Sequence, residues 1–236
     1  MRTMIILLSV VMLTFAAAAY PQNSMITTLD AKWIAKDLDI GRLDDAAWKR
    51  AHWTVVDRYW SGEPAPSGRR FKAALLWSAK YLYIKFDAEQ NEPLVVSKSP
   101  DLKRKTIGLW DRDVLEIFIA PDRAKPHKYF EFELAPTGEW IDLGIEVTPT
   151  ERKTDWEYAS GMSSAVRTED GKVVMAMKIP FSALGKAPKT GDLWMGNLFR
   201  CVGRDPGRGY LAWRPTRTEK PNFHVPDVFG GFHFAK

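Results

Sequence analysis

The segment from Trp110 to Ile119 places an indole just before an alternating run that carries an acidic side chain. Trp110 follows Thr106-Ile107-Gly108-Leu109, a stretch expected to form a loop, and Glu116 lies inside the run. A flat aromatic face packs against the C–H groups of a sugar ring, and a carboxylate accepts hydrogen bonds from its hydroxyls. This segment therefore has both chemical components of a sugar-binding site.

Pairs of carboxylates in the chain also permit acid–base chemistry. The candidate pairs are Glu116 with Asp113, and Glu131 with Glu133. Retaining glycosidases hold two carboxyl groups about 5–5.5 Å apart and inverting ones about 6.5–9.5 Å, and residues two apart on a strand approach such a spacing. Because such pairs are abundant in β-proteins, hydrolysis of O-glycosyl bonds stays an alternative to binding without catalysis.

The apolar run from Leu193 to Val202 contains two polar side chains, Asn197 and Arg200, which fall on opposite faces of a strand. A buried polar group needs partners. Each of these two residues is therefore a candidate ligand contact or a tie between loops. Cys201 lies in the same run as the single cysteine of the chain, so we expect a buried, inert thiol and no intrachain disulfide.

The overall composition is that of an ordinary globular protein. The 236 residues are 45% hydrophobic and 27% charged, with a net charge of +5. These values exclude a disordered chain, a collagen-like repeat and a coiled coil. The basic residues are scattered, with the densest cluster at 103–105, and no nucleic-acid-binding fingerprint follows, so we expect no nucleic-acid partner. Aromatic residues make up 12% of the chain, which makes aromatic surface its most abundant resource.

The N-terminus has the pattern of an export signal. Arg2 precedes an apolar run from Met4 to Phe15, and four alanines, Ala16 to Ala19, follow. The run is shorter than the ~20 residues that span a bilayer. We therefore expect a signal peptide at 1–19, cleavage near Ala19, a domain at 26–236 that has no membrane contact after cleavage, and a periplasmic or extracellular location.

Past Met25 the dominant hydrophobic period is two, which is typical of strands. Turn sequences such as Glu169-Asp170-Gly171 separate the runs, and only 44–51 and 180–184 have the pattern of short helices. We expect an all-β, single-domain fold: an antiparallel sandwich of the jelly-roll or immunoglobulin-like type. The expected strands are 71–77, 81–87, 114–120, 129–134, 139–145, 172–179, 193–202, 210–213 and 231–234.

Four segments, in order, resemble the family 9 carbohydrate-binding modules and the wider superfamily of DOMON-like sandwiches. They are Ile40 to Trp48, similar to "D-G-x-L/I-D-x-x-W"; Ala74 to Ile84, similar to "lW-D-x-x-x-L-Y-V"; Trp110 to Ile119, similar to "W-x-x-D-x-V-E-I-F-I"; and Phe223 to Phe234, similar to "W/F-x-x-P-x-x-F-G-x-L-x-F". The resemblance covers about residues 26 to 236 and implies a jelly-roll β-sandwich.

The resemblance also implies roles for individual residues. Trp110 would be one of two aromatic walls that sandwich a terminal sugar, and Glu116 would hydrogen-bond its hydroxyls. Phe223, three residues before Pro226, would be the second wall. The residues that flank this second wall and reach ring hydroxyls would be Asn222 and His224.

The function that the resemblance implies is an exported protein that grips the end of a poly- or oligosaccharide and supports carbohydrate catabolism beside polysaccharide-degrading enzymes. Glu133 stands roughly where some members carry Arg, so the ligand preference is expected to differ. Members often hold structural calcium. The acids that could supply its oxygen ligands here are Asp44, Asp45, Asp87, Glu89 and Glu92.

A haem-binding electron carrier is a further alternative, because some DOMON-like domains hold haem. Met175 and Met177 share a face with Val173 and Ile179, which is the pattern of plain core. The other candidate axial ligands are His127, His224, His233, Met162 and Met195.

Overall fold

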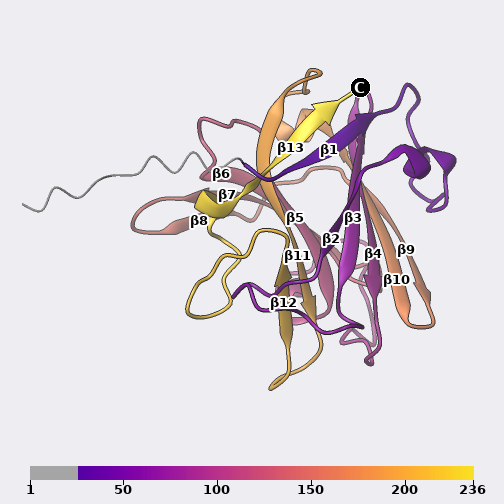
Figure 1. Cartoon of the computed structure of the whole chain (residues 1–236), viewed down its shortest axis with the longest axis vertical. Helices are drawn as coiled ribbons and strands as arrows, with labels where there is room; N and C mark the ends of the chain where they lie inside the picture. Colours follow the sequence, from indigo (N-terminus) through magenta and orange to yellow (C-terminus); the bar gives the residue numbers. More distant parts are fainter. Residues whose placement is uncertain (1–25) are drawn as a thin grey trace, which may run out of the picture.

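The alternating runs form strands in the computed structural model, which describes residues 26–236 (Figure 1). The expected signal peptide at 1–19 lies outside the described residues. The strands are β1 Thr28–Trp33, β2 Trp53–Val56, β3 Phe71–Trp77, β4 Tyr81–Glu89, β5 Val114–Ala120, β6 Lys128–Leu134, β7 Trp140–Val147, β8 Arg152–Asp155, β9 Ser163–Glu169, β10 Lys172–Pro180, β11 Leu193–Val202, β12 Gly209–Ala212 and β13 Gly230–Ala235.

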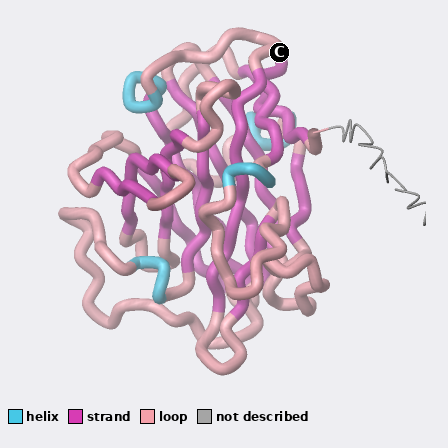
Figure 2. The backbone as a smooth tube through the Cα atoms, turned by 90° about the vertical axis from the view of Figure 1, so that its left-hand side faces the viewer, coloured by secondary structure: helices cyan, strands magenta, loops and turns pink. Residues whose placement is uncertain are grey.

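Helical structure in this region is confined to single 3₁₀ turns between strands (Figure 2). These are η1 Ala46–Arg50, η2 Leu109–Asp111, η3 Phe181–Leu184 and η4 Pro226–Val228. The range 44–51 contains η1 as expected, and the N-cap is the second of its two aspartates, since Asp45 rather than Asp44 accepts the hydrogen bond from Ala47 N, at 2.9 Å. The Asp44 carboxylate instead binds the Arg167 guanidinium.

The strands form one curled sheet in the order β8-β7-β6-β5-β11-β13-β1-β3-β4-β10-β9, with β12 added beside β11 and β2 beside β3. The expectation of an all-β sandwich is confirmed. Its antiparallel pattern has two exceptions, since β1 pairs in parallel with both β13 and β3. Figure 1 shows β1 and β13 side by side although they come from opposite ends of the chain. The β1–β3 pair has the long crossover that parallel pairing requires.

The main core lies inside the curled sheet and contains apolar side chains that alternate along the strands. Leu115, Ile117 and Ile119 of β5 meet Phe132 and Leu134 of β6 in this core. Met175 and Met177 also lie here, as their pattern indicated.

The opposite face of β5, β6 and β11 is buried as well, in a second apolar cluster that includes Phe118, Phe199, Phe223 and Phe229. This layer therefore has no solvent-exposed face over most of its area. The C-terminal segment around η4 supplies Phe223 and Phe229 and closes the second cluster.

Four strands were not predicted from the sequence. The burial patterns of β8 and β9 explain two of them, because these edge strands are mostly exposed and polar and lack a buried stripe. β1 and β2 are short, at six and four residues, and bury only Leu29 and Ala31 in β1 and Val56 in β2. Among residues 26–236 no helix has the length and apolar character needed to cross a membrane.

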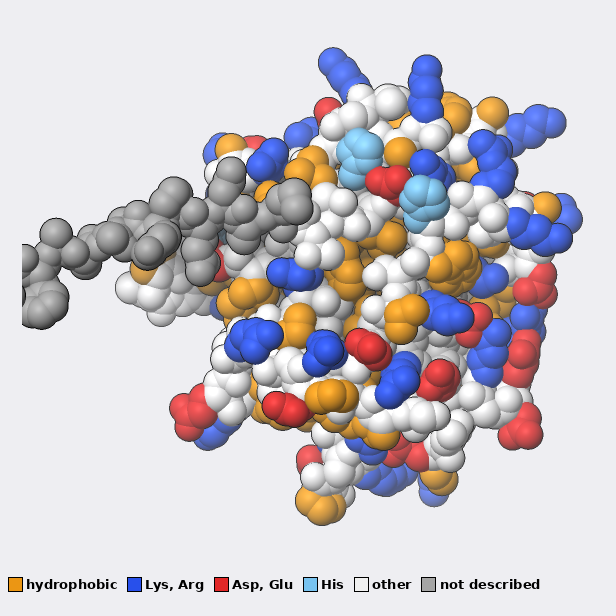
Figure 3. Space-filling view, viewed as in Figure 1, with side chains coloured by type: hydrophobic (Ala, Val, Ile, Leu, Met, Phe, Trp, Pro, Cys, Tyr) orange, Lys and Arg blue, Asp and Glu red, His pale blue; other side chains and the backbone are white. Residues whose placement is uncertain are grey.

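Basic and acidic side chains are interspersed over the face drawn in Figure 3. The net charge of +5 is therefore not gathered into one basic patch on this face.

We expect Gly196→Ala to destabilise the fold, because β11 passes very close to its neighbours at this glycine. A Cβ at Gly196 would lie 2.3 Å from Phe118 O and 2.3 Å from Phe232 Cε2. Overpacking of this kind costs about 1–3 kcal/mol, which lowers the Tm of a domain of this size by several degrees. Gly207→Ala is the control, because its nearest contact is at 3.7 Å. Equal melting temperatures for the two variants would contradict the predicted close approach.

Candidate functional site

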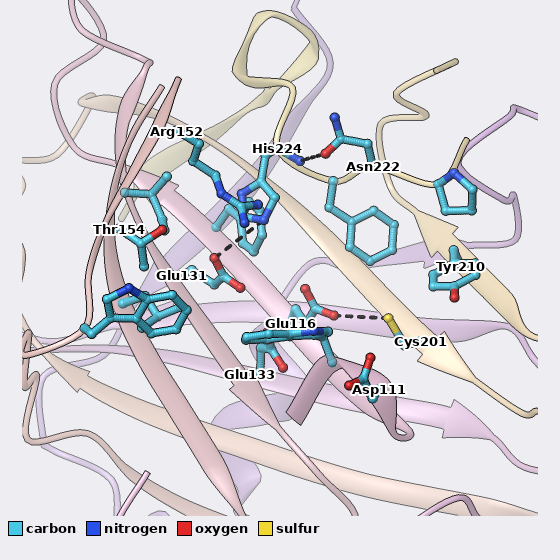
Figure 4. A pocket seen from close by; sticks show the side chains of 17 residues that line it. Asp111, Glu116, Glu131, Glu133, Arg152, Thr154, Cys201, Tyr210, Asn222 and His224 are labelled. Carbon is cyan, nitrogen blue, oxygen red and sulfur yellow. Dashed lines mark hydrogen bonds and ion pairs between the residues drawn. The ribbon is translucent and has the colours of Figure 1, made fainter. Parts of the chain in front are cut away.

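A pocket of about 310 Å³ opens on the doubly buried layer, between β5, β6 and β7 and the loops that cover them. Figure 4 shows acidic, aromatic and basic side chains gathered around it. Its lining is Trp110, Asp111, Glu116, Phe118, Glu131, Glu133, Leu143, Ile145, Arg152, Thr154, Trp156, Cys201, Tyr210, Pro221, Asn222, Phe223 and His224.

Strand register places three glutamates together in this pocket. Glu116 on β5 is directly opposite Glu133 on β6, and Glu131 lies two residues from Glu133 on the same face of β6. One carboxylate oxygen from each lies within 4.8 Å of the others. All three side chains are buried, with exposed fractions of 0–3%. Glu131 and Glu133 lie on the face of β6 opposite Phe132, as alternation along a strand requires, and this face is covered rather than open.

The three carboxyl groups have few hydrogen-bond partners. Glu116 Oε1 accepts from the Cys201 thiol at 3.4 Å, and thiols are weak donors. Both carboxyl oxygens of Glu133 and one of Glu131 have no hydrogen-bond partner outside the cluster, and within it a protonated Glu133 donates to Glu131. The nearest ring nitrogen to that Glu131 oxygen is Nε2 of His224, at 4.0 Å.

Burial shifts the protonation of these groups. Loss of hydration, with the neighbouring Glu131 carboxyl, raises the pKa of Glu116 to about 8. Burial raises the pKa of Glu131 to about 6 and holds the pKa of Glu133 well above its usual range. Burial also lowers the pKa of His224 to about 3, so this imidazole is neutral near pH 7. The deep part of the pocket thus holds acidic groups that attract Arg152 and Arg208 at a distance but form no ion pair with either arginine.

Two indoles stand at the edge of the pocket. Trp110, on η2, has 38% of its surface exposed and Trp156, after β8, has 43%. Their ring centroids are 6.4 Å apart at an interplanar angle of 46°. Arg208 binds the carbonyl of Trp110 at 2.8 Å, and Lys105 binds that of Trp156 at 3.2 Å. The side chains of Arg208 and Lys105 therefore fix the backbone of both tryptophans, while the indole rings stay accessible.

The C-terminal segment supplies the opposite part of the lining. Phe223 stacks on Phe199 with centroids 4.1 Å apart, so it belongs to the second core cluster and also lines the pocket. His224 Nδ1 lies 2.8 Å from the hydroxyl of Tyr129. Asn222 is exposed, and its Oδ1 accepts from the backbone N–H of His224.

The structure thus brings five of the seven candidate site residues to one pocket: Trp110, Glu116, Asn222, Phe223 and His224. Asn197 and Arg200 lie outside its lining. Asn197 bonds the backbone N and O of Arg214, and Arg200 bonds backbone carbonyls of Arg69 and Glu89. Both side chains therefore tie loops to β11, which is one of the two roles considered for them.

The acids expected to hold calcium do not gather into one cluster. Asp44 pairs with Arg167, Asp87 with Lys172, and Glu92 with Arg69. Within residues 26–236, one group of His, Cys, Asp or Glu side chains has its ligand atoms close enough for a metal ion, and it is the three glutamates described above.

Asp113, the partner considered for Glu116 in hydrolysis, lies outside the pocket lining. Its carboxylate accepts hydrogen bonds from the backbone N–H groups of Val95 and Gly203, at 3.1 and 2.8 Å. The pocket residues that sequence reasoning missed include Trp156 and Arg152. They lie 46 and 42 residues after Trp110 around a short exposed strand, and no spacing links them to it.

Comparison with known families gives a match over most of the chain. The family model described as "Carbohydrate family 9 binding domain-like" matches residues 40–235. The matched range includes every side chain that lines the pocket.

Solved structures with the same fold include two states of one family 9 carbohydrate-binding module from Caldicellulosiruptor kristjanssonii. The complex with cellotriose has a TM-score of 0.62 at 13% identity, and the match covers 89% of this chain and 94% of the chain in that complex. The complex with glucose has a TM-score of 0.63 at 13% identity, over 88% of this chain and 95% of its own. A candidate carbohydrate-binding protein from Bacteroides uniformis has a TM-score of 0.70 at 17% identity, over 89% and 100%.

A curated relative is endo-1,4-beta-xylanase C from Paenibacillus barcinonensis, which is 32% identical over 88 residues. The match covers 37% of this chain and only 7% of the xylanase, so it concerns a small part of that enzyme.

We expect Glu116→Gln to remove part of a pH dependence of stability. The unfolded chain ionises Glu116 near its ordinary pKa of 4.5, and the folded protein does so near a pKa of 8. Between these values the folded state holds more protons, so the free energy of unfolding falls as pH rises. From pH 5 to pH 8 the variant should gain at least about 1.4 kcal/mol over the parent, the equivalent of one pKa unit.

Thermal or urea unfolding across this pH range measures the difference. Glu169→Gln is the matched control, because Glu169 is an exposed carboxylate paired with Arg167. A constant difference between Glu116→Gln and the parent from pH 5 to pH 8 would refute the raised pKa.

Proposed function

The chain belongs to the carbohydrate family 9 binding domain-like family, and on that premise we propose that it binds the terminal sugar of a poly- or oligosaccharide in the pocket beside Trp110. Family membership supports sugar binding in general. The observation that carries the assignment to this pocket is the joint presence of exposed indoles and buried carboxylates in one cavity of about 310 Å³.

The two parts of the lining suit the two parts of a sugar ring. The indoles of Trp110 and Trp156 offer apolar faces for C–H groups, and Phe223 offers a third aromatic surface from the C-terminal segment. Glu116, Asn222 and other polar groups reach the ring hydroxyls. Phe223 contributes only part of its area because Phe199 covers one of its faces.

A biological setting follows from the N-terminal sequence. We propose that residues 1–19 direct export to the periplasm or the exterior, where the protein binds polysaccharide fragments and supports their catabolism beside degrading enzymes. The support is the charged start, the apolar run from Met4 to Phe15 and the alanines before Tyr20.

Glycoside hydrolysis is a second candidate function, favoured by one observation. Oxygens of Glu116, Glu131 and Glu133 lie within 4.8 Å of one another, and burial raises the pKa values of all three carboxyl groups. A protonated carboxyl beside an ionised one is the arrangement that glycosidases use. Release of reducing ends from xylo- or cello-oligosaccharides would favour catalysis, and their recovery intact would favour binding alone.

We expect Trp110→Ala to weaken sugar binding at least tenfold with little change in Tm. The indole is largely outside the core, so its loss removes contact area for the sugar without leaving a core cavity. Calorimetric titration with glucose, cellobiose and xylo-oligosaccharides measures the affinity. Trp53→Ala is the matched control, since Trp53 is 37% exposed but lies on β2 and outside the pocket lining. Equal affinities for the two variants and the parent would eliminate this site.

The export proposal has its own measurement. Protein recovered from the native host should begin near Tyr20 when its N-terminus is sequenced, because a signal peptidase cleaves after small residues such as those at 18 and 19. Recovery from the cytoplasm with Met1 in place would contradict export.

A further inference from the structure

The three buried glutamates of the pocket can ionise at low cost only beside a positive charge, and without one burial keeps protons on Glu116 and Glu133. Ionised carboxylates in a site without water are costly unless a cation and hydrogen bonds compensate them. Glu133 is fully buried, lines the pocket, and neither of its carboxyl oxygens has a hydrogen-bond partner outside the glutamate cluster. Figure 4 shows Glu116, Glu131 and Glu133 converging on one region of the cavity.

The protein's own cations do not meet this demand. His224 Nε2 is 4.0 Å from the nearest oxygen of Glu131, and its Nδ1 already contacts Tyr129. Arg152 lines the pocket from an exposed position on β8 and attracts Glu131 at a distance, as Arg208 attracts Glu116, but neither arginine forms a hydrogen bond or ion pair with the three glutamates. The positive charge is therefore expected to come from a ligand.

The geometry fits an ammonium group. An alkylammonium has three N–H donors, one for each carboxylate. Acceptors about 2.8 Å from a common nitrogen, in tetrahedral directions, lie about 4.6 Å apart. The glutamate oxygens, which are mutually within 4.8 Å, satisfy this arrangement.

The remainder of the pocket indicates what carries the ammonium. A cavity of about 310 Å³ has room for a sugar ring above the glutamates, and aromatic faces line its edge. A calcium ion wants six to eight oxygen ligands, whereas Phe118, Leu143, Ile145 and the aromatic side chains occupy much of this lining. A sugar ring with one amino substituent would contact both the aromatic edge of the pocket and the three glutamates.

We propose that the pocket selects a sugar that bears a primary ammonium group, a 2-amino-2-deoxyhexose, and that Glu116, Glu131 and Glu133 together hold the ammonium. This inference rests on the proposed function and names the class of sugar that the same site takes.

The test compares three ligands that differ at one carbon: glucosamine, glucose and N-acetylglucosamine. Calorimetric titration of the parent protein should show glucosamine at least tenfold tighter than the other two, because only its substituent is cationic. In Glu133→Gln the preference for glucosamine over glucose should fall towards one. In Glu169→Gln, which alters a surface carboxylate on β9, the preference should persist.

Each other outcome overturns the inference in a distinguishable way. Equal affinity of the parent for glucosamine and glucose would refute ammonium selection and leave sugar binding intact. Absence of binding by all three sugars would count against both this inference and the proposed function. Calcium chloride alone binding to the parent, and not to Glu133→Gln, would identify the site as a metal site instead. The comparison in the parent protein decides the matter even if a variant fails to fold.

Discussion

The arrangement of this protein depends on a β-layer that is buried on both faces. β5, β6 and β11 pack one face against the inter-layer core and the other against a second apolar cluster closed by the C-terminal segment. Antiparallel register then fixes Glu116 opposite Glu133, inside that second covered face. In an ordinary sandwich the same residues would point to water. Because the outer face is covered, three strand glutamates that water would otherwise hydrate become interacting, poorly solvated carboxyl groups.

Much of the fold was predictable because alternation is a local signal. The β3–β4 hairpin, β5 and β11 lie where the sequence placed them, since each carries a continuous inward stripe. β8 and β9 carry no such stripe and were missed. The parallel pairing of β1 was also unpredictable, because it joins segments about 200 residues apart through registers that no local pattern specifies.

The candidate site was predictable only in part, because local motifs are visible in the sequence and contacts between distant segments are not. The resemblance located Trp110, Glu116 and Phe223, which the fold brings to one pocket. Trp156 follows an exposed four-residue strand, and only the folded chain shows that its ring lies 6.4 Å from that of Trp110. For Asn197 and Arg200 the sequence left two roles open. Asn197 bonds the backbone of Arg214, and Arg200 bonds backbone carbonyls of Arg69 and Glu89 and the side chain of Gln90. Polar residues in an apolar run signal burial, but they do not specify which partner satisfies them.

The glutamate cluster would couple the proposed ligand binding to stability in this pocket. The raised pKa values keep protons on Glu116 and Glu133 near neutral pH, which lowers the free-energy cost of burying their carboxyl groups. A cationic ligand favours their ionised form, so its binding near neutral pH releases protons and uses charge–charge attraction that a neutral sugar lacks. The same loss of hydration that makes burial of these carboxyl groups costly thus strengthens their attraction for a cationic ligand. On this argument the burial of the carboxyl groups, which costs stability, would give the proposed site its selectivity for a charged ligand.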